Sequence, residues 1–268
     1  MYKKFLMACL LLMSLFACKK DNQTNVIVNI ADDFYVDMFE DISNGDQRFQ
    51  LNISTISTQS CLNYLIDYDV TIDKESHAIE LIINDLIEPA TCEVGVSITE
   101  ITIPLGFLPN GYYSFNLNLK NAVFNKGRLG VFQDQYLLDM NSDDGIDIVN
   151  AILYRIPKNT LWGYVAYENN SSATAGGNFV SSLENLPTVN NIENNNLYPF
   201  GYYGYFKLKE DSKIDLSEEI NANHHIPFFF QNDSDDVSTI RTLVEDACGN
   251  SNLAIHIFTE SGLEIKCE

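Results

Sequence analysis

The chain has 268 residues, of which 37 are acidic and 16 are basic, so its formal net charge at pH 7 is −21. A field of that sign repels phosphate backbones, so nucleic acid is not an expected partner. It also opposes adsorption of the protein body onto an anionic membrane face. We expect the acidic surface to keep the protein soluble rather than to bind a particular cation.

The first 17 residues have the features of a secretory signal peptide. Lys3 and Lys4 make a short basic start, and the apolar run FLMACLLLMSLF begins at Phe5. This run is shorter than the roughly 20 residues that span a bilayer. It ends at the small residue Ala17, after which we expect cleavage. Loss of the two lysines would change the net charge from −21 to −23.

The residues around Cys18 resemble two targeting signals. LFAC, residues 15–18, resembles the lipobox of bacterial lipoproteins, and KKDN, residues 19–22, is similar to the export signal of surface lipoproteins of Bacteroidota. The resemblance implies a palmitate-type acyl group on Cys18, a lipidated linker over residues 18–25, and durable anchoring by acyl chains. It also implies an outer-membrane location that faces the cell exterior, with the periplasmic face as the alternative. An ordinary signal peptide followed by a chance cysteine is the other interpretation.

The remaining cysteines suggest disulfides. One of the six cysteines lies in the predicted signal peptide and one carries the predicted lipid, which leaves Cys61, Cys92, Cys248 and Cys267. An even number in an oxidising compartment is typical of disulfide pairs. Of the three possible pairings we favour Cys61–Cys92 and Cys248–Cys267, because each closes a short loop within one candidate domain. A metal site is the alternative, but no C-x-x-C spacing supports it.

Residues 26–140 show apolar and polar residues in alternation. RFQLNIS places Phe49, Leu51 and Ile53 on one face, and YLIDYDVTID, HAIELIIND and GRLGVFQDQYLL have the same period. Such strands, separated by turn residues, predict an antiparallel β-sandwich. LPNGYYSFNL resembles the turn-then-tyrosine entry to a late strand of immunoglobulin-like modules, with Tyr112 or Tyr113 as the corner tyrosine. The resemblance implies an Ig-like architecture, although the Cys…Trp…Cys spacing of antibody domains is missing.

Residues 139–147, DMNSDDGID, interrupt the alternation. We interpret them as a linker or as the entry to a second domain. They also resemble calcium loops of the form D-x-N-x-D-G, with Asp139, Asn141 and Asp143 as oxygen ligands. Asp144 is inserted before the glycine, and no glutamate follows at the EF-hand distance. A solvated linker and a calcium site are therefore the two alternatives.

Residues 147–268 mix strand and helix patterns. From Leu161 the order is strand, helix, strand, strand, helix, strand, with a further terminal strand. The helices are expected over TAGGNFVSSLENLP and SDDVSTIRTLVEDACGN, and Ser234 can cap the second one. The strands between them are GYYGYFKLK and HHIPFFFQ. This order predicts a ferredoxin-like βαββαβ domain of the α+β class.

The run LYPFGYYGYFKLK concentrates aromatic residues. If GYYGYFKLK is one strand, one of its faces packs on the helices and the other can present tyrosines to a sugar or a protein. This hypothesis gives an aromatic platform of Trp162, Tyr202, Tyr203 and Tyr205. The alternative is that these side chains are ordinary core residues of a sheet.

The sequence contains no motif of a known enzyme class. A G-x-S-x-G elbow, an H-E-x-x-H zinc helix and both glycine-rich phosphate loops are missing. A catalytic pair of carboxylates would not stand out among 37 acidic residues. The adjacent His224 and His225 would point to opposite faces in a strand, whereas in a loop they could hold a haem or a metal ion.

These observations favour a non-enzymatic, lipid-anchored envelope protein that binds a glycan or an envelope protein, in adhesion or scaffolding. A carboxylate-based glycan hydrolase is the first alternative, and a structural subunit of an outer-membrane assembly is the second. We expect no cofactor, with calcium at residues 139–143 as the alternative.

Overall fold

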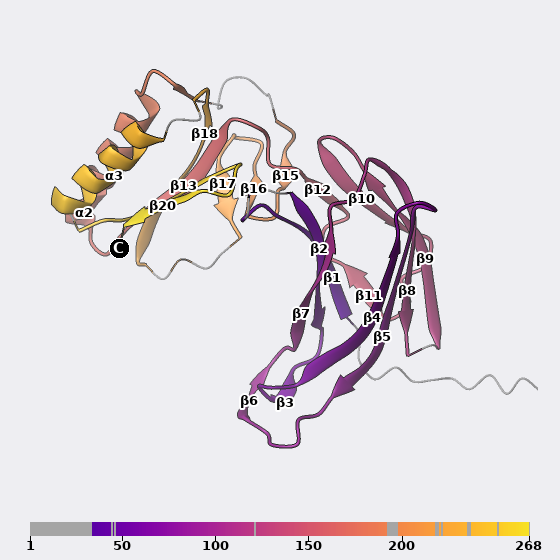
Figure 1. Cartoon of the computed structure of the whole chain (residues 1–268). Coiled ribbons are helices and arrows are strands. Elements are labelled where there is room, and N and C mark those ends of the chain that lie inside the picture. The colour runs from indigo at the N-terminus through magenta and orange to yellow at the C-terminus, as the bar shows by residue number, and fades with distance from the viewer. Residues whose placement is uncertain are drawn as a thin grey trace, which may run out of the picture. The chain divides into compact units, whose positions relative to one another are not determined.

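The computed structural model describes residues 34–43, 45, 47–120, 122–191, 198–217, 220, 222–234, 237–250 and 252–267. The predicted signal peptide, the predicted lipidated linker and Cys18 lie outside these residues. Across the described residues the chain is mainly β, with several antiparallel sheets and two helices in the C-terminal half (Figure 1). This confirms the mainly β class.

A four-stranded sheet has the order β11-β1-β2-β7. Its strands are β1 (Phe34–Asp41), β2 (Arg48–Thr55), β7 (Glu100–Gly106) and β11 (Ile146–Ile148). β1 and β2 are antiparallel, with Val36 opposite Ile53 and Met38 opposite Leu51. Alternate residues of both strands are buried, as the alternation in RFQLNIS predicts.

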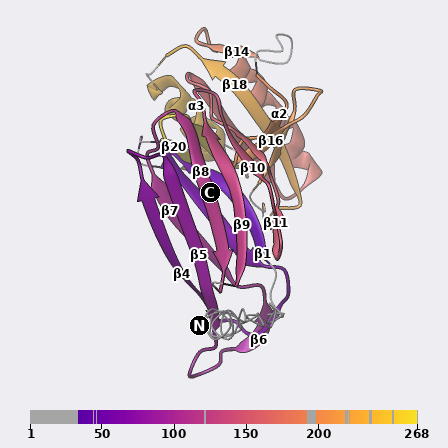
Figure 2. The same cartoon turned by 90° about the vertical axis from the view of Figure 1, so that its right-hand side faces the viewer.

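A six-stranded sheet has the order β12-β10-β9-β8-β5-β4. Its strands are β4 (Leu65–Asp73), β5 (Ala78–Ile87), β8 (Gly111–Leu119), β9 (Val123–Val131), β10 (Gln135–Met140) and β12 (Ile152–Tyr154). Neighbouring strands are antiparallel except β5 and β8, which are parallel with Leu81 opposite Leu117. Figure 2 shows β4, β5, β8 and β9 side by side.

The buried faces of these two sheets pack on each other. The rings of Phe49 on β2 and Tyr136 on β10 lie 4.6 Å apart, centroid to centroid. The Tyr136 hydroxyl donates to Glu40 Oε1 on β1 at 2.7 Å, and Arg155 Nε, just after β12, donates to the same oxygen at 2.9 Å. A buried ion pair and an aromatic contact thus link the sheets within an otherwise apolar interface.

A tyrosine corner marks the entry to β8. Of the two expected candidates, Tyr113 is the fully buried one, and its hydroxyl donates to Pro109 O at 3.0 Å. The same arrangement recurs 90 residues later, where the Tyr203 hydroxyl donates to Pro199 O at 2.8 Å. Both tyrosines end the pattern P-x-G-Y-Y, whose glycines have φ of 152° and 144°, a region that residues with a Cβ rarely adopt. The pattern thus makes the same turn into a strand twice.

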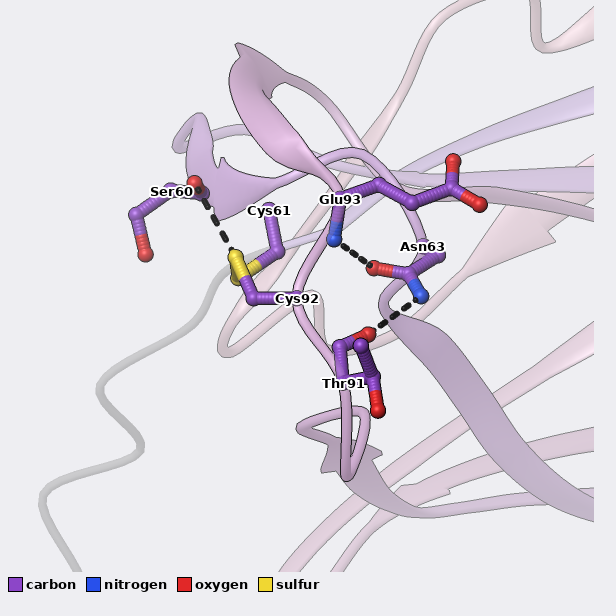
Figure 3. Close-up of a disulfide and its surroundings, with 6 residues drawn as sticks. All are labelled: Ser60, Cys61, Asn63, Thr91, Cys92 and Glu93. Carbon is purple, nitrogen blue, oxygen red and sulfur yellow. Dashed lines mark hydrogen bonds between the residues drawn. A yellow bond between two sulfur atoms is a disulfide. The ribbon is translucent and has the colours of Figure 1, made fainter.

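A two-stranded ribbon lies at one end of the sandwich (Figures 1 and 2). Its strands are β3 (Gln59–Cys61) and β6 (Val94–Ser97). The Cys61–Cys92 disulfide joins β3 to the segment just before β6, as Figure 3 shows. Beside it, Asn63 Nδ2 donates to Thr91 O at 2.9 Å, and Asn63 Oδ1 accepts from the backbone N–H of Glu93 at 3.0 Å.

The C-terminal half contains a five-stranded sheet of order β14-β18-β13-β19-β20. Its strands are β13 (Thr160–Tyr167), β14 (Val189–Asn191), β18 (His224–Asn232), β19 (Ala254–Thr259) and β20 (Glu264–Cys267). All neighbouring strands in it are antiparallel. Within the described residues, this sheet shares no strand with the two N-terminal sheets.

Two helices cover one face of this sheet. α2 (Asn170–Glu184) begins after Asn169, whose side chain accepts from the backbone N–H of Ser172. α3 (Ser238–Asn250) presents Ile240 and Val244 to the sheet, as its apolar stripe predicts. The Cys248–Cys267 disulfide links α3 to β20.

The opposite face is covered by a small three-stranded sheet. Its strands are β15 (Gly201–Tyr202), β16 (Phe206–Leu208) and β17 (Ile214–Leu216). The prediction of one strand over GYYGYFKLK is therefore wrong. Gly204, with φ of 83°, turns the chain so that β15 pairs back onto β16, and β14 occupies the place expected for that strand in the five-stranded sheet.

Residues 139–147, interpreted as a linker or as the entry to a second domain, lie between strands of the N-terminal sheets. β10 continues to Met140, β11 pairs in parallel with β1, and β12 pairs with β10. β11 and β12 are only three residues long, but both are hydrogen-bonded to strands of the two N-terminal sheets. The chain therefore leaves these sheets only after Tyr154, the last residue of β12. All the described residues belong to one compact unit, and the division into domains 26–140 and 147–268 stays a prediction.

Candidate functional site

The outer face of the four-stranded sheet carries a row of polar side chains. The register puts Tyr35 opposite Ser54, Ser54 opposite Glu100, and Asp37 opposite Asn52. Because successive side chains of a strand point to opposite faces, these five point away from the buried core. They line a groove of about 360 Å³. The full lining is Tyr35, Asp37, Asn52, Ile53, Ser54, Glu100 and Val149.

Asp37 is held in place by several donors. Its Oδ1 accepts from the backbone N–H of Met38 at 2.9 Å and from Asn150 Nδ2 at 3.0 Å. The Tyr202 hydroxyl also donates to this carboxylate. Burial raises the pKa of Asp37 above its usual value, and the three hydrogen bonds oppose that rise. The carboxylate is therefore a fixed acceptor rather than a mobile surface charge.

The other polar groups of the groove are available to a ligand. Asn52 Oδ1 accepts from Thr102 Oγ1 at 2.9 Å, but among the described residues the Asn52 amide nitrogen has no acceptor. The hydroxyls of Tyr35 and Ser54 and the carboxylate of Glu100 also lack protein partners within the described part of the chain. Donors and acceptors therefore lie beside the Tyr35 ring, and the residue is 38% exposed. Sugars, which combine hydroxyls with apolar ring faces, match this combination.

The two carboxylates of the groove come from strands that are not neighbours. β2 separates Asp37 on β1 from Glu100 on β7, and the register offsets them by two residues. With strands about 4.8 Å apart and about 3.3 Å per residue, their backbone positions are about 12 Å apart. Because the Asp37 carboxylate is tied to three donors, the arrangement suits binding better than hydrolysis.

A second hollow, of about 740 Å³, lies at the ends of the sheets. Its lining consists of Gly45, Gln47, Arg48, Gly106, Phe107, Lys158, Glu260 and Ser261. The amide oxygen of Gln47 already accepts a hydrogen bond from Arg155 Nη2. Most of the lining comes from loops and strand ends, which position side chains less rigidly than strand interiors do. The groove on the four-stranded sheet is therefore the better-defined site.

The predicted aromatic platform is wrong as a ligand surface. Trp162 and Tyr203 are each only 1% exposed. The Trp162 ring lies 5.5 Å from that of Tyr205 and 5.6 Å from that of Phe206, within the core beneath the three-stranded sheet. Of the four platform residues, Tyr202 alone reaches the groove, through its bond to Asp37. The aromatics are buried because a sheet that sequence periodicity did not reveal covers them.

In the predicted calcium loop, the Asp139 side chain is engaged by an arginine. The Asp139 carboxylate binds the Arg128 guanidinium across the β9–β10 pair, at 3.0 Å from Nε and 2.9 Å from Nη2. Asn141 and Asp143 follow in the turn, where the carbonyl oxygen of Asp143 accepts from the backbone N–H of Ile146. Among the described residues, no three His, Cys, Asp or Glu side chains are grouped as a metal site requires.

The two adjacent histidines lie in a strand and not in a loop. His224 and His225 begin β18, opposite Tyr167 and Ala166 of β13. The His224 ring stacks on Tyr167 at 5.4 Å. Because neighbouring strand residues point to opposite faces, this placement does not provide two ligands for one metal or haem.

The four structural cysteines pair as favoured. Cys61–Cys92 and Cys248–Cys267 are both disulfides, so these thiols are neither metal ligands nor nucleophiles. The lipidation predicted at Cys18 lies outside the described residues.

The groove residues did not stand out in the sequence. Tyr35 and Asp37 lie in YVDMFED, whose alternation is shared by every half-exposed strand. One feature of the sequence could have pointed to the groove. The outward positions of β1 and β2 carry aromatic, carboxylate, amide and hydroxyl side chains rather than only charged ones. Register was needed to show that these rows meet.

No helix among the described residues is both long and apolar enough to cross a membrane. In comparisons with known proteins, the chain matched no family model, no curated protein and no solved structure. The candidate site therefore rests on its geometry.

Proposed function

We propose that this protein is a non-enzymatic, lipid-anchored envelope protein that binds a glycan in the groove on its four-stranded sheet. The observation that carries the proposal is the set of available groups beside Tyr35: the Asn52 amide, the Ser54 hydroxyl and the Glu100 carboxylate. The fixed Asp37 carboxylate adds an acceptor whose position does not depend on the ligand. An acidic groove favours neutral or cationic sugars over acidic ones.

The proposal includes a surface location. The resemblance of residues 15–22 to a lipobox and an export signal supports acylation at Cys18 and exposure to the exterior. Cys18 precedes Phe34 by 16 residues, which reach about 50 Å when fully extended. Labelling with an alkyne palmitate analogue should mark the chain and should fail on Cys18→Ala. Protease treatment of intact cells distinguishes the exterior from the periplasmic face.

We further propose an Ig-like architecture for the N-terminal sheets and a ferredoxin-like topology for the C-terminal sheet. Two stacked sheets with the Tyr113 corner support the first, as an architecture and not as a strand connectivity. The order β14-β18-β13-β19 supports the second. If these four strands are numbered by their order along the chain, their order in the sheet is 2-3-1-4. This is the antiparallel arrangement of a βαββαβ unit.

A glycan array with the detergent-solubilised full chain, followed by calorimetry on the best glycan, tests the binding proposal. Tyr35→Ala and Asn52→Ala should each weaken binding about tenfold, the equivalent of one lost contact of about 1.4 kcal/mol. Tyr112→Ala is the matched control, because Tyr112 is an exposed tyrosine on the other sheet. Unchanged melting temperatures would show that the variants fold. Equal affinity in Tyr35→Ala and wild type would contradict the proposal.

The hydrolase alternative has its own readout. If the protein releases reducing ends from a bound glycan, and Asp37→Asn or Glu100→Gln abolishes this release, the groove is a hydrolase site and not only a binding site. Binding without product release, retained over long incubation, supports the binding protein.

A further inference from the structure

The end of the sandwich that carries the β3–β6 ribbon exposes an unusual number of large apolar side chains. Val94, Val96 and Leu65 are 92%, 74% and 64% exposed. We define the tip as the seven exposed apolar residues around this ribbon: Ile56, Leu62, Leu65, Ile87, Val94, Val96 and Ile98. Isolated exposed apolar residues are normal, but such a group on a soluble chain marks an interaction surface.

The tip residues are brought together by backbone pairing. Leu65 lies directly opposite Ile87 in the β4–β5 pair. Ile56 and Ile98 flank Thr55 and Thr99, whose backbone N–H and carbonyl groups are bonded at 2.9 Å. Figures 1 and 2 place β3 and β6 at the same end as the adjoining ends of β4 and β5. The seven residues therefore belong to one surface region.

The ribbon is apolar on both faces. Leu62 lies across Gly95, where an added Cβ would be 2.6 Å from Leu62 Cδ2. Val94 and Val96 flank Gly95, so alternation directs them to the face opposite Leu62. Both apolar faces of such a ribbon can be buried only if the partner contacts the ribbon from two sides, as a groove or pocket does.

The charges around the tip are mostly acidic. No Lys or Arg occurs between Arg48 and Lys74 or between Lys74 and Lys120. Lys74 belongs to the turn at the far end of β4, where its Nζ donates to Phe107 O. Lys120 also lies near the tip, but its Nζ is 3.0 Å from the carboxylate of Asp85, so these two charges compensate each other. Asp67, Glu88 and Glu93 are exposed acidic residues without such a partner among the described residues. A complementary surface must therefore combine apolar contact with Lys or Arg at its edge.

We propose that the tip docks into an apolar groove of a protein partner whose rim carries Lys or Arg. The Cys61–Cys92 disulfide and the two Asn63 hydrogen bonds in Figure 3 hold the ribbon in shape before binding, which lowers the entropy lost on association. This site is separate from the glycan groove and does not depend on it.

Other occupants fit less well. A second copy of the chain would bring the same acidic residues together, which costs free energy by like-charge repulsion. An anionic lipid surface meets the same repulsion. Insertion into hydrocarbon would also leave the backbone groups at the edges of a two-stranded ribbon without partners.

The test places the photo-crosslinking residue p-benzoylphenylalanine at position 96 of the full chain in intact cells. Position 124 is the matched control, because Phe124 is an exposed apolar residue of β9, in the six-stranded sheet rather than the ribbon. We expect a protein adduct from position 96 and none from position 124, with the adduct on apolar residues flanked by Lys or Arg. The purified pair should then bind about tenfold more weakly with Val96→Asp, and unchanged with Phe124→Asp.

The same pair should lose affinity as salt rises from about 50 to about 500 mM, since the rim charges are exposed. Tyr35→Ala should leave the adduct intact, which keeps this result independent of glycan binding. Three results overturn the proposal. They are an adduct only with another copy of the chain, co-sedimentation with vesicles of phosphatidylethanolamine and phosphatidylglycerol, and a partner surface without basic residues.

Discussion

Replacing Arg155 by methionine tests how the two N-terminal sheets are joined. The Glu40 side chain is 1% exposed and that of Arg155 12%, with Glu40 Oε1 and Arg155 Nη2 2.9 Å apart. Glu40 Oε2 has no hydrogen-bond partner in the described structure. The charge of Glu40 therefore depends on Arg155 and on the Tyr136 hydroxyl. Removing one member of a buried ion pair costs about 3–5 kcal/mol, so Arg155→Met should lose that much stability at neutral pH.

A second substitution separates charge from packing. Glu40→Gln in the Arg155→Met background removes the uncompensated charge, so the double variant should recover much of the lost stability. Glu40→Gln alone should cost less than Arg155→Met, because neutral glutamine still accepts from Tyr136 and Arg155. The coupling between the two changes, obtained from a double-mutant cycle, measures the ion pair itself.

The pH dependence gives an independent check. Burial raises the pKa of Glu40 above the value of 4.5, although Arg155 and Tyr136 oppose the rise. A raised folded-state pKa means that the Glu40 contribution is fully present below pH 4.5 and is lost as pH rises through the folded-state pKa. Without Arg155 the folded-state pKa rises further, so the loss of stability in Arg155→Met should be larger at pH 8 than at pH 5.5.

Urea unfolding followed by the fluorescence of Trp162, the single tryptophan, measures these free energies. Stability losses in Arg155→Met below about 1 kcal/mol at pH 8, the range typical of exposed pairs, would refute the buried-pair reasoning. So would equal losses at pH 5.5 and pH 8.

Two further predictions concern stability. In Gly163→Ala the new Cβ would lie 1.9 Å from His256 O in the neighbouring strand, so the variant should unfold at much lower urea. Gly177→Ala in α2 meets open space and should stabilise by about 0.4–1 kcal/mol, and equal midpoints for the two variants would contradict the close-packing argument. Replacing Cys61 and Cys92 together by serine opens a loop with a sequence separation of 31 and should cost about 3.7 kcal/mol by urea unfolding. An unchanged midpoint would mean that the ribbon end does not take part in cooperative unfolding.

Local periodicity predicted much of the N-terminal fold. β2 lies where RFQLNIS alternates, and Phe49, Leu51 and Ile53 are all buried. Tyr113 forms the corner that LPNGYY suggested. Both predictions succeed because the side-chain period of a strand and the geometry of a turn are decided by a few neighbouring residues.

Predictions that needed distant partners failed. DMNSDDGID looked like a linker because its polar residues give no period, yet β11 pairs with β1 more than 100 residues earlier. GYYGYFKLK looked like one strand because its alternation is regular, yet the positive φ of Gly204 divides it. In each case the backbone partners, rather than the local residues, decided the structure.

The candidate site illustrates the same division. Each of the five polar groove residues lies at a position that the alternation of its own strand directs outward, which is a local property. Which outward residues become neighbours depends on the register of β1, β2 and β7 and on Tyr202 reaching Asp37 from another sheet. A change of one residue in register would turn each of these side chains to the other face.

We could predict the alternating strands, the two helices, the acidic charge and the favoured disulfide pairing from the amino-acid sequence alone. These follow from spacing along the chain and from the small number of ways to close short loops. The folded structure was needed to show that Trp162 and Tyr203 are core residues, that Asp37 and Asn52 share a groove, and that Val94 and Val96 are exposed. Burial depends on what covers a side chain, and the covering elements come from parts of the chain that no local pattern connects.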